Sequence, residues 1–240
     1  MDFEISEFDA VFFDLDGTLL GLSDDAFEGT YTKLIAKRFI DKLEPERFVN
    51  ALWEGTEAMM KHHNPDIHVL DAFFNRFGEL TGISRDETYQ RFDEFYQNEF
   101  GKLESVCDPV PEARKLVDEL TEMGKKVVLA TNPVFPEIAT RRRCDWTNLD
   151  FDEFTHVSHA ENSYACKPNP AYYLRLLEIA GVKPERTLMV GNDYLFDMAA
   201  AEVGMKTWLI DKYLGNDEHK DKFRIDYRGS LNELLTQIKT

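Results

Sequence analysis

Apolar residues are spaced in two different ways over the first hundred positions of the chain. Residues 8–14 form a short apolar run rich in aromatic and branched side chains, which predicts a buried strand ending at Asp14. Gly17 then interrupts the run. The next 85 residues or so show helical spacing and no convincing strand. We expect helices there over residues 27–40, 45–61, 69–80 and 85–100.

From residue 108 onward, short apolar runs alternate with stretches of helical spacing. The apolar runs predict strands over residues 126–131, 154–158, 187–191 and 206–210. The helical spacing predicts helices over residues 112–123, 169–180 and 197–203. Apolar strands that alternate with helices indicate the α/β class, with a parallel sheet and helices on both of its faces.

The first strand therefore belongs to an α/β domain that resumes roughly 90 residues later. We expect a core domain made of residues 1–20 and 108–240, and an all-helical inserted domain, the cap, made of residues 21–107. The cap enters at the carboxyl end of the first strand, the edge at which open α/β sheets bind ligands. Hinges near Leu20-Gly21 and Asp108-Pro109 would let it open and close.

The net charge of the chain limits the kinds of molecule that we expect it to bind. The 240 residues carry 45 acidic and 28 basic side chains, a formal net charge of −17. Such a field repels nucleic-acid backbones and anionic lipids, so we expect neither nucleic acid nor a membrane as a partner. A small anionic substrate would need a local cation to enter that field. The acidic N-terminus does not resemble a signal peptide, and no apolar run is long enough to span a membrane.

The three cysteines, Cys107, Cys144 and Cys166, are odd in number and lack CxxC spacing. This pattern favours reduced thiols in a cytoplasmic protein over a disulfide framework or a zinc site. Lys167 follows Cys166 directly and could lower the pKa of its thiol, but a packing role is the favoured interpretation of Cys166.

Polar residues gather where the predicted strands end. Residues 14–18 follow the first strand, residues 131–132 end the second, Lys167 comes after the third, and residues 191–197 follow the fourth. Parallel strands end at one edge of a sheet, so we expect these groups to meet in one crevice. Four carboxylates in one crevice favour a divalent cation, and a donor set made only of oxygens favours Mg²⁺ over zinc.

Phosphoryl transfer needs these groups. It requires a nucleophile in line with phosphorus, a metal ion, donors for the phosphate oxygens and a proton source for the leaving group. Asp14 can be the nucleophile and form an aspartyl-phosphate, while Asp16 can act as general acid and then as base. Gly17 lets the backbone turn its N–H groups toward the anion. The remaining assignments are phosphate binding by Thr131, Asn132 and Lys167, metal coordination by Asp14, Asp16 and Asp193, and orientation of the metal or of Lys167 by Asp197 and Asn192.

The sequence resembles the haloacid dehalogenase (HAD) superfamily in four ordered motifs: Asp14-Leu15-Asp16-Gly17-Thr18-Leu19, Ala130-Thr131-Asn132, Cys166-Lys167-Pro168, and Gly191-Asn192-Asp193 with Asp197. The resemblance covers residues 5–20 and 108–212, and the helical insertion is similar to the small cap of phosphatase-type members. It implies a Rossmann-like core, dependence on Mg²⁺ and a phosphoaspartate mechanism with these residues. Many members have Asp directly after the last motif's glycine, so Asn192 is a further candidate for the metal.

Asp16 distinguishes among the activities of that superfamily. Dehalogenase and phosphonatase branches usually lack a carboxylate at this position, so its presence favours a phosphatase or a sugar-phosphate mutase. We expect a Mg²⁺-dependent phosphatase that acts on a small phosphorylated metabolite, as a monomer or a small homo-oligomer. The alternatives are a phosphosugar mutase or other phosphotransferase, and a binding or regulatory protein with the same fold.

The cap should select the substrate, but its residues allow more than one interpretation. Residues 61–64 (Lys61, His62, His63 and Asn64) form a polar loop, and exposure to solvent is favoured over contact with substrate. Helical spacing favours a place in the cap's own core for two aromatic sets, Phe73, Phe74 and Phe77, and Phe92, Phe95 and Tyr96. We expect the basic run Arg141-Arg142-Arg143 to lie on a solvated helix face.

Overall fold

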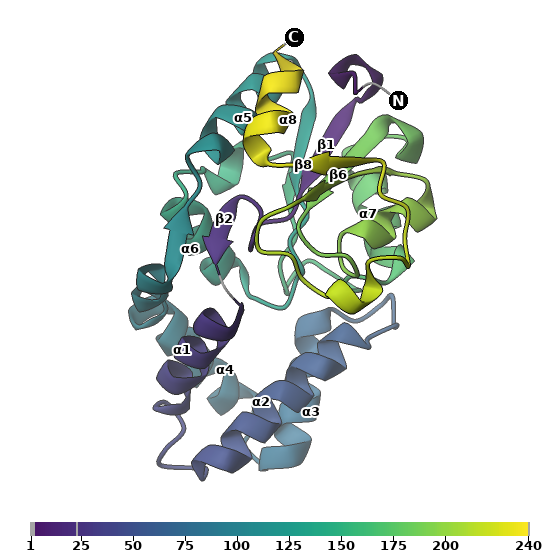
Figure 1. The fold of residues 1–240 in the computed structure, drawn as a ribbon. Helices are drawn as coiled ribbons and strands as arrows, with labels where there is room; N and C mark the ends of the chain where they lie inside the picture. The colour runs from purple at the N-terminus through teal and green to yellow at the C-terminus, as the bar shows by residue number, and fades with distance from the viewer. Residues whose placement is uncertain (1–2, 23, 240) are drawn as a thin grey trace.

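The computed structural model describes residues 3–22 and 24–239. Figure 1 shows two parts: a six-stranded sheet with helices on both faces, and a group of four helices beyond one end of the sheet. Both chain termini lie at the end of the sheet away from these four helices (Figure 1). Within the described part of the chain, none of the helices has the length and apolar character that crossing a bilayer requires.

All six strands of the main sheet run parallel, in the order β5-β4-β1-β6-β7-β8. Their bounds are β1 (Ala10–Phe13), β4 (Lys126–Leu129), β5 (His156–Val157), β6 (Thr187–Gly191), β7 (Lys206–Ile210) and β8 (Tyr227–Gly229). The central strand β1 pairs with β4 on one side and with β6 on the other. The predicted α/β fold is therefore confirmed, and β8 is an additional strand that the sequence pattern did not predict.

Alternate side chains of β1 enter two different clusters, one on each face of the sheet. The helices that cover the faces are α5 (Pro111–Glu122), α6 (Glu137–Trp146), α7 (Pro170–Ala180) and α8 (Leu231–Ile238). Val11 and Phe13 pack in the cluster that includes apolar residues of α5 and α8. Ala10 and Phe12 pack in the cluster that includes α7. The continuous apolar run in β1 thus reflects burial on both faces, as expected of a central parallel strand.

Four helices make up the inserted segment, and their bounds are α1 (Asp24–Ala36), α2 (Pro45–Met60), α3 (Val69–Thr81) and α4 (Arg85–Asn98). Each overlaps a helix that the sequence pattern predicts, but α1 ends at Ala36, whereas the predicted helix extends to residue 40. Fully buried aromatic rings hold the group together, since the ring centroids of Phe39 and Phe48 lie 4.9 Å apart and those of Phe39 and Phe77 lie 5.5 Å apart. We keep the name cap for this group of helices.

A short antiparallel ribbon joins the cap to the sheet. Strand β2 (Leu20–Leu22) pairs with β3 (Cys107–Pro109), with Leu20 opposite Pro109 and Gly21 opposite Asp108. The sequence pattern predicts no strand within residues 22–107, because strands of three residues give no periodic signal. The two predicted hinge positions lie opposite each other in this ribbon.

Short 3₁₀ helices complete the chain: η1 (Ile5–Glu7), η2 (Phe100–Val106), η3 (Phe151–Glu153), η4 (Pro184–Arg186), η5 (Met198–Val203) and η6 (Asp217–His219). The helix predicted over residues 197–203 is the 3₁₀ helix η5, with Asp197 at its N-cap. The small side chains of Ala199 and Ala200 are buried in the cluster that includes α7, so this 3₁₀ helix packs closely on α7 and the sheet.

Candidate active site

Asp14 lies at the carboxyl end of the central strand. Its N–H donates to the carbonyl of Val190 on β6 at 2.9 Å, so its backbone keeps the register of the sheet. Only 8% of Asp14 is exposed. A carboxylate buried to this degree needs a positive partner, because an unpaired charge is costly to remove from water.

Lys167 supplies that positive charge. It is fully buried, and its Nζ donates to Oδ1 of Asp14 at 2.8 Å and to Oδ1 of Asp197 at 2.6 Å. Burial alone would lower the pKa of Lys167, but the charges of Asp14 and Asp197 raise it well above its ordinary value. Burial also raises the pKa of Asp197 to about 7, against the opposing effect of Lys167. The ammonium group is therefore a fixed cation directly beside Asp14.

Gly191 and Asp197 fit together at the end of β6. A side chain at Gly191 would collide with the carboxylate of Asp197, so the glycine leaves the space that this carboxylate fills. Oδ2 of Asp197 accepts the N–H of Asp193 at 3.0 Å. This contact holds the loop between the two aspartates and aims the other oxygen of Asp197 at Lys167.

Asp193 is held by the same loop. Its Oδ1 accepts the N–H groups of Leu195 and Phe196 at 2.8 and 2.7 Å, and its Oδ2 accepts the amide of Asn216 at 2.7 Å. Burial raises the pKa of Asp193, and the charge of Asp14 adds to that rise. The carboxylates of Asp193 and Asp14 thus repel each other in a partly desolvated site.

The loop after Asp14 is tied to the loop after β6. Gly17 has a φ of +84°, and a side chain there would collide with Asn192, so both the turn and the close approach require glycine. The hydroxyl of Thr18 donates to Oδ1 of Asn192 at 2.9 Å, and Nδ2 of Asn192 donates to the carbonyl of Tyr213 at 2.5 Å. Asn192 therefore connects two loops, and its role toward a metal stays a prediction.

Thr131 and Asn132 follow β4 and reach the same edge of the sheet. Thr131 is buried, and its carbonyl accepts the hydroxyl of Tyr172 at 2.8 Å. Oδ1 of Asn132 accepts the N–H of Lys167 at 3.2 Å, and Nδ2 of Asn132 lies 3.3 Å from Sδ of Met60 in α2. Asn132 thus contacts both the lysine that pairs with Asp14 and the cap.

Asp16 is paired with Arg143, a residue that the sequence pattern predicts on a solvated helix face. Arg143 is fully buried on the inner face of α6, and its guanidinium forms an ion pair with Oδ2 of Asp16. The same guanidinium lies 4.6 Å from the ring centre of Phe135. The prediction of a solvated face was therefore wrong for Arg143, whereas Arg141 is partly exposed. One turn before Arg143, Ala139 is also buried, which marks this face of α6 as the packed one.

The family of the chain can be stated from these features and from its sequence. The sequence model of haloacid dehalogenase-like hydrolases matches residues 8–204, which include Asp14, Lys167 and Asp197. The chain belongs to this family.

One relative and two solved structures of other proteins match this HAD-like hydrolase over nearly its whole length. The chain is 23% identical over 235 residues to pyrophosphatase PpaX of Bacillus cereus (strain AH820), a match that covers 95% of the chain and 96% of the relative. Its fold is similar to that of a HAD phosphatase from Thermococcus onnurineus, with a TM-score of 0.61, 22% identity, and 95% and 96% of the two chains covered. A predicted phosphoglycolate phosphatase from Haemophilus somnus 129PT gives a TM-score of 0.61 at 16% identity, with 96% and 97% covered.

A cavity of about 590 Å³ opens beside Asp16 and Asn132 in this HAD-like hydrolase. Most of its other lining residues belong to α1–α4, to the loop after β4 and to α6. Four of the aromatic residues assigned to the cap's core line it: Phe73, Phe74, Phe92 and Tyr96. These four side chains are also buried, as a place in the cap's core requires. The prediction of a core role was therefore incomplete, because the same packed rings form part of the cavity wall. The other two, Phe77 and Phe95, are fully buried.

The polar loop of residues 61–64 lies apart from that cavity. Lys61 is exposed and pairs with Glu57 of its own helix at 2.5 Å. Nδ1 of His63 lies 3.1 Å from Nδ2 of Asn169. None of the four loop residues is part of the cavity wall.

Burial controls the chemistry of the cysteines. Cys107, Cys144 and Cys166 are all free thiols, and burial raises the pKa of each to about 12. Lys167 therefore does not activate Cys166, and the favoured packing role fits its full burial. The predicted cytoplasmic location stays a prediction.

The ion pair between Asp16 and Arg143 gives a prediction about stability. We expect Asp16→Asn to lower the free energy of unfolding by roughly 2–4 kcal/mol, because it leaves a fully buried guanidinium without its carboxylate. Urea denaturation monitored by circular dichroism measures the loss. The double variant Asp16→Asn/Arg143→Met should recover part of it. A single variant as stable as the wild type would show that the pair contributes little.

Proposed function

We propose that this protein is a Mg²⁺-dependent phosphatase that hydrolyses a small phosphomonoester through an aspartyl-phosphate on Asp14. The observation that best supports this proposal is the fully buried Lys167 between Asp14 and Asp197, beside a cavity whose wall includes Asp16. A nucleophilic carboxylate and a fixed cation thus lie together at one edge of the sheet, next to an acid–base candidate that lines a space in which a phosphoester fits.

The proposed reaction has two displacements at phosphorus. In the first, a carboxylate oxygen of Asp14 forms a bond to phosphorus while the ester P–O bond breaks, and Asp16 protonates the departing oxygen. In the second, Asp16 takes a proton from water, the water oxygen attacks phosphorus, and the bond to Asp14 breaks. Lys167 holds Asp14 in place and offsets the negative charge of the phosphoryl oxygens. Asp16 is paired with Arg143, so we propose that this ion pair opens when a phosphoester enters.

The donor set suits a hard divalent cation. Asp14 and Asp193 offer carboxylate oxygens, and their mutual repulsion in a buried site is relieved by a shared cation. Among the side chains that the structure describes, no three His, Cys, Asp or Glu are already gathered around one point, so Asp14 and Asp193 with backbone or water oxygens would hold the ion. When bound, Mg²⁺ would polarise the phosphoryl group and neutralise charge that develops on it.

Removal of the metal should abolish most of the activity. We expect phosphate release from p-nitrophenyl phosphate with Mg²⁺, and a loss of at least about 100-fold with EDTA, because a Lewis-acid metal contributes several kcal/mol and each ~1.4 kcal/mol is tenfold in rate. Added Mg²⁺ should restore the rate, and an unchanged melting temperature in EDTA would exclude unfolding as the cause. Equal turnover with and without EDTA would contradict the proposed dependence on a metal.

Two further substrates should be tested in this assay, because they follow from the names of similar proteins. Pyrophosphate follows from the name of the Bacillus cereus relative, and phosphoglycolate from that of the Haemophilus somnus structure. Both are small anions with a second charged group beyond the phosphoryl that would be transferred.

A further inference from the structure

The cavity beside Asp16 is walled mostly by aromatic and aliphatic side chains. Rings come from α1, α2, α3 and α4, and they include Phe27, Tyr31, Trp53, Phe73, Phe92 and Tyr96. Met59 and Met60 of α2 add flexible thioethers, which adapt to the shape of an apolar ligand. A volume of about 590 Å³ lies within the range of pockets that hold small organic molecules.

Several polar groups among the aromatic side chains of this wall already have partners. The hydroxyls of Tyr31 and Tyr96 lie 2.9 Å apart and hydrogen-bond to each other. The hydroxyl of Thr56 donates to the carbonyl of Leu52 in its own helix at 3.0 Å. Burial raises the pKa of Tyr31 to about 12, as expected where water is excluded. A ligand rich in hydroxyls, such as a sugar, would lose hydration against the aromatic part of this wall, where apolar ring atoms take the place of the lost water.

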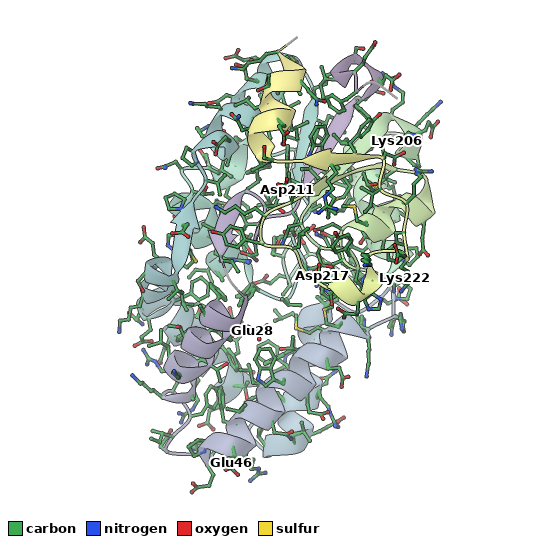
Figure 2. The ribbon with its side chains drawn as sticks, in the orientation of Figure 1. Glu28, Glu46, Lys206, Asp211, Asp217 and Lys222 are labelled. Atoms are coloured by element: carbon green, nitrogen blue, oxygen red, sulfur yellow. The ribbon has the colours of Figure 1, made fainter. Side chains whose placement is uncertain are left out.

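The charges of the wall disfavour a second anionic group on the ligand. Among the described residues that line the cavity, Arg141 is the one basic side chain. Its guanidinium is already paired with Glu137 at 2.7 Å and with Asp152 at 2.8 Å, and it stacks 3.9 Å from the ring centre of Phe151. Glu28, labelled on α1 in Figure 2 on the side near the core, lines the cavity as an exposed acidic residue.

The cavity adjoins the phosphate end of the site through Asp16 and Asn132, whereas Asp14 and Lys167 are not part of its wall. Asn132 lines it, contacts Met60 of the wall, and accepts the N–H of Lys167. A phosphoryl group beside Lys167 would therefore direct the rest of its molecule into the aromatic space, with Asp16 at the junction.

We propose that the preferred substrate is a phosphomonoester of an uncharged, largely apolar alcohol, whose hydrocarbon part fills this cavity. The inference rests on the proposed phosphatase function and names the class of its leaving group. It sets the protein apart from an enzyme for pyrophosphate, phosphoglycolate or sugar phosphates, because those leaving groups carry charge or hydroxyls that the wall does not match.

A series of n-alkyl phosphates tests this proposal without changing the chemistry of the leaving group. We expect kcat/KM in the presence of Mg²⁺ to rise about threefold per methylene from ethyl to hexyl phosphate, because each methylene leaves water for an apolar wall. Benzyl phosphate should exceed glycerol phosphate, phosphoglycolate and pyrophosphate by at least about 100-fold. A flat series, or a preference for the charged substrates, would overturn the proposed leaving group while leaving phosphatase activity established.

Binding of n-alkyl phosphonates, which cannot be hydrolysed, separates the two proposals. Calorimetry with methyl- and hexylphosphonate should show affinity that rises with chain length. If no ester is hydrolysed but affinity still rises, the apolar site stands and the phosphatase function fails. Equal affinities would overturn the apolar site.

A positive charge introduced into the cavity wall should weaken the preference for apolar leaving groups and favour charged ones. We expect Thr56→Lys on α2 to lower kcat/KM for hexyl phosphate by at least about tenfold and to raise it several-fold for phosphoglycolate. Asn50→Lys adds the same charge to the same helix at an exposed position outside the cavity and should keep the wild-type slope along the alkyl series. Identical slopes in wild type and Thr56→Lys would place the hydrocarbon elsewhere and overturn the proposal.

Discussion

Asp14→Asn should reduce phosphate release by at least about 10⁴-fold, since a carboxamide cannot replace the nucleophile of the proposed reaction. Asparagine has nearly the same shape as aspartate, and Lys167 keeps its contact with Asp197 at 2.6 Å. We therefore expect the variant to fold. Steady-state release of phosphate measures the loss, and acid-quenched peptide mapping of the wild type should find the phosphoryl group on the peptide that contains Asp14.

Asp9→Asn is a matched control for that variant. Asp9 immediately precedes β1 at its opposite end, where its exposed carboxylate pairs with Arg186 at 2.6 Å. The same chemical change there should leave kcat and KM within about twofold of wild type. Activity in folded Asp14→Asn that approaches the wild-type rate would exclude the phosphoaspartate mechanism.

Lys167→Met should be the most destabilising of the substitutions considered for this site. Lys167 is fully buried with Asp14 and Asp197, so its removal leaves two buried carboxylates without their cation. Loss of one partner from a buried ionic group costs about 3–5 kcal/mol. We expect a decrease of that size in the free energy of unfolding at pH 8, measured by urea denaturation, together with loss of phosphate release.

This loss of stability should depend on pH. Burial raises the pKa of Asp197 in the folded state to about 7, whereas its value in the unfolded state is about 4. The contribution of Asp197 to the free energy of unfolding therefore falls as the pH rises, and it is lost by about pH 7 in the wild type. Lys167 opposes that rise in pKa, so in Lys167→Met the decline continues to higher pH. The difference in unfolding free energy between wild type and variant should therefore widen from pH 7 to pH 8.

Lys206→Met provides the matched control for pH. Lys206, labelled in Figure 2, pairs with Asp226 at 2.9 Å, but its side chain is 29% exposed. Loss of this partly exposed pair should lower the free energy of unfolding by about 1 kcal/mol. Lys206 and other partners lower the pKa of Asp226 despite burial, so that aspartate stays ionised throughout the range. Lys206→Met should therefore lower the free energy of unfolding equally at pH 7 and pH 8. If Lys167→Met also lowered it equally at both pH values, that result would contradict the effect of Lys167 on the pKa of Asp197.

Buried strands and the groups that follow them could be predicted from the sequence. The bounds of β6 and β7 agree with the prediction because both are short apolar runs between glycine and polar residues. Asp14, Thr131 and Asp193 could then be placed at one edge, because parallel strands have to end together. That reasoning needs only the direction of the strands and no knowledge of side-chain contacts.

Contacts between elements could not be predicted in the same way. Arg143 belongs to a run of three arginines, and only the packing of α6 decides which of them is buried against Asp16. Met60 and Tyr172 contact the motif residues from other elements and carry no motif of their own. Helical spacing showed that Phe73 and Phe92 face inward, but it could not show that the interior contains a cavity.

The position of β1 in the sheet has a consequence for synthesis of the protein. The ribosome makes this central strand first, yet its neighbours begin only at Lys126 and Thr187. At about 5–20 residues per second, β1 waits on the order of 10 s for both partners. During that time Val11, Phe12 and Phe13 form an apolar segment without its partners in the sheet. Exposed apolar segments of this kind aggregate readily, so we expect the segment that leads to Asp14 to bind holdase chaperones until the sheet closes around it.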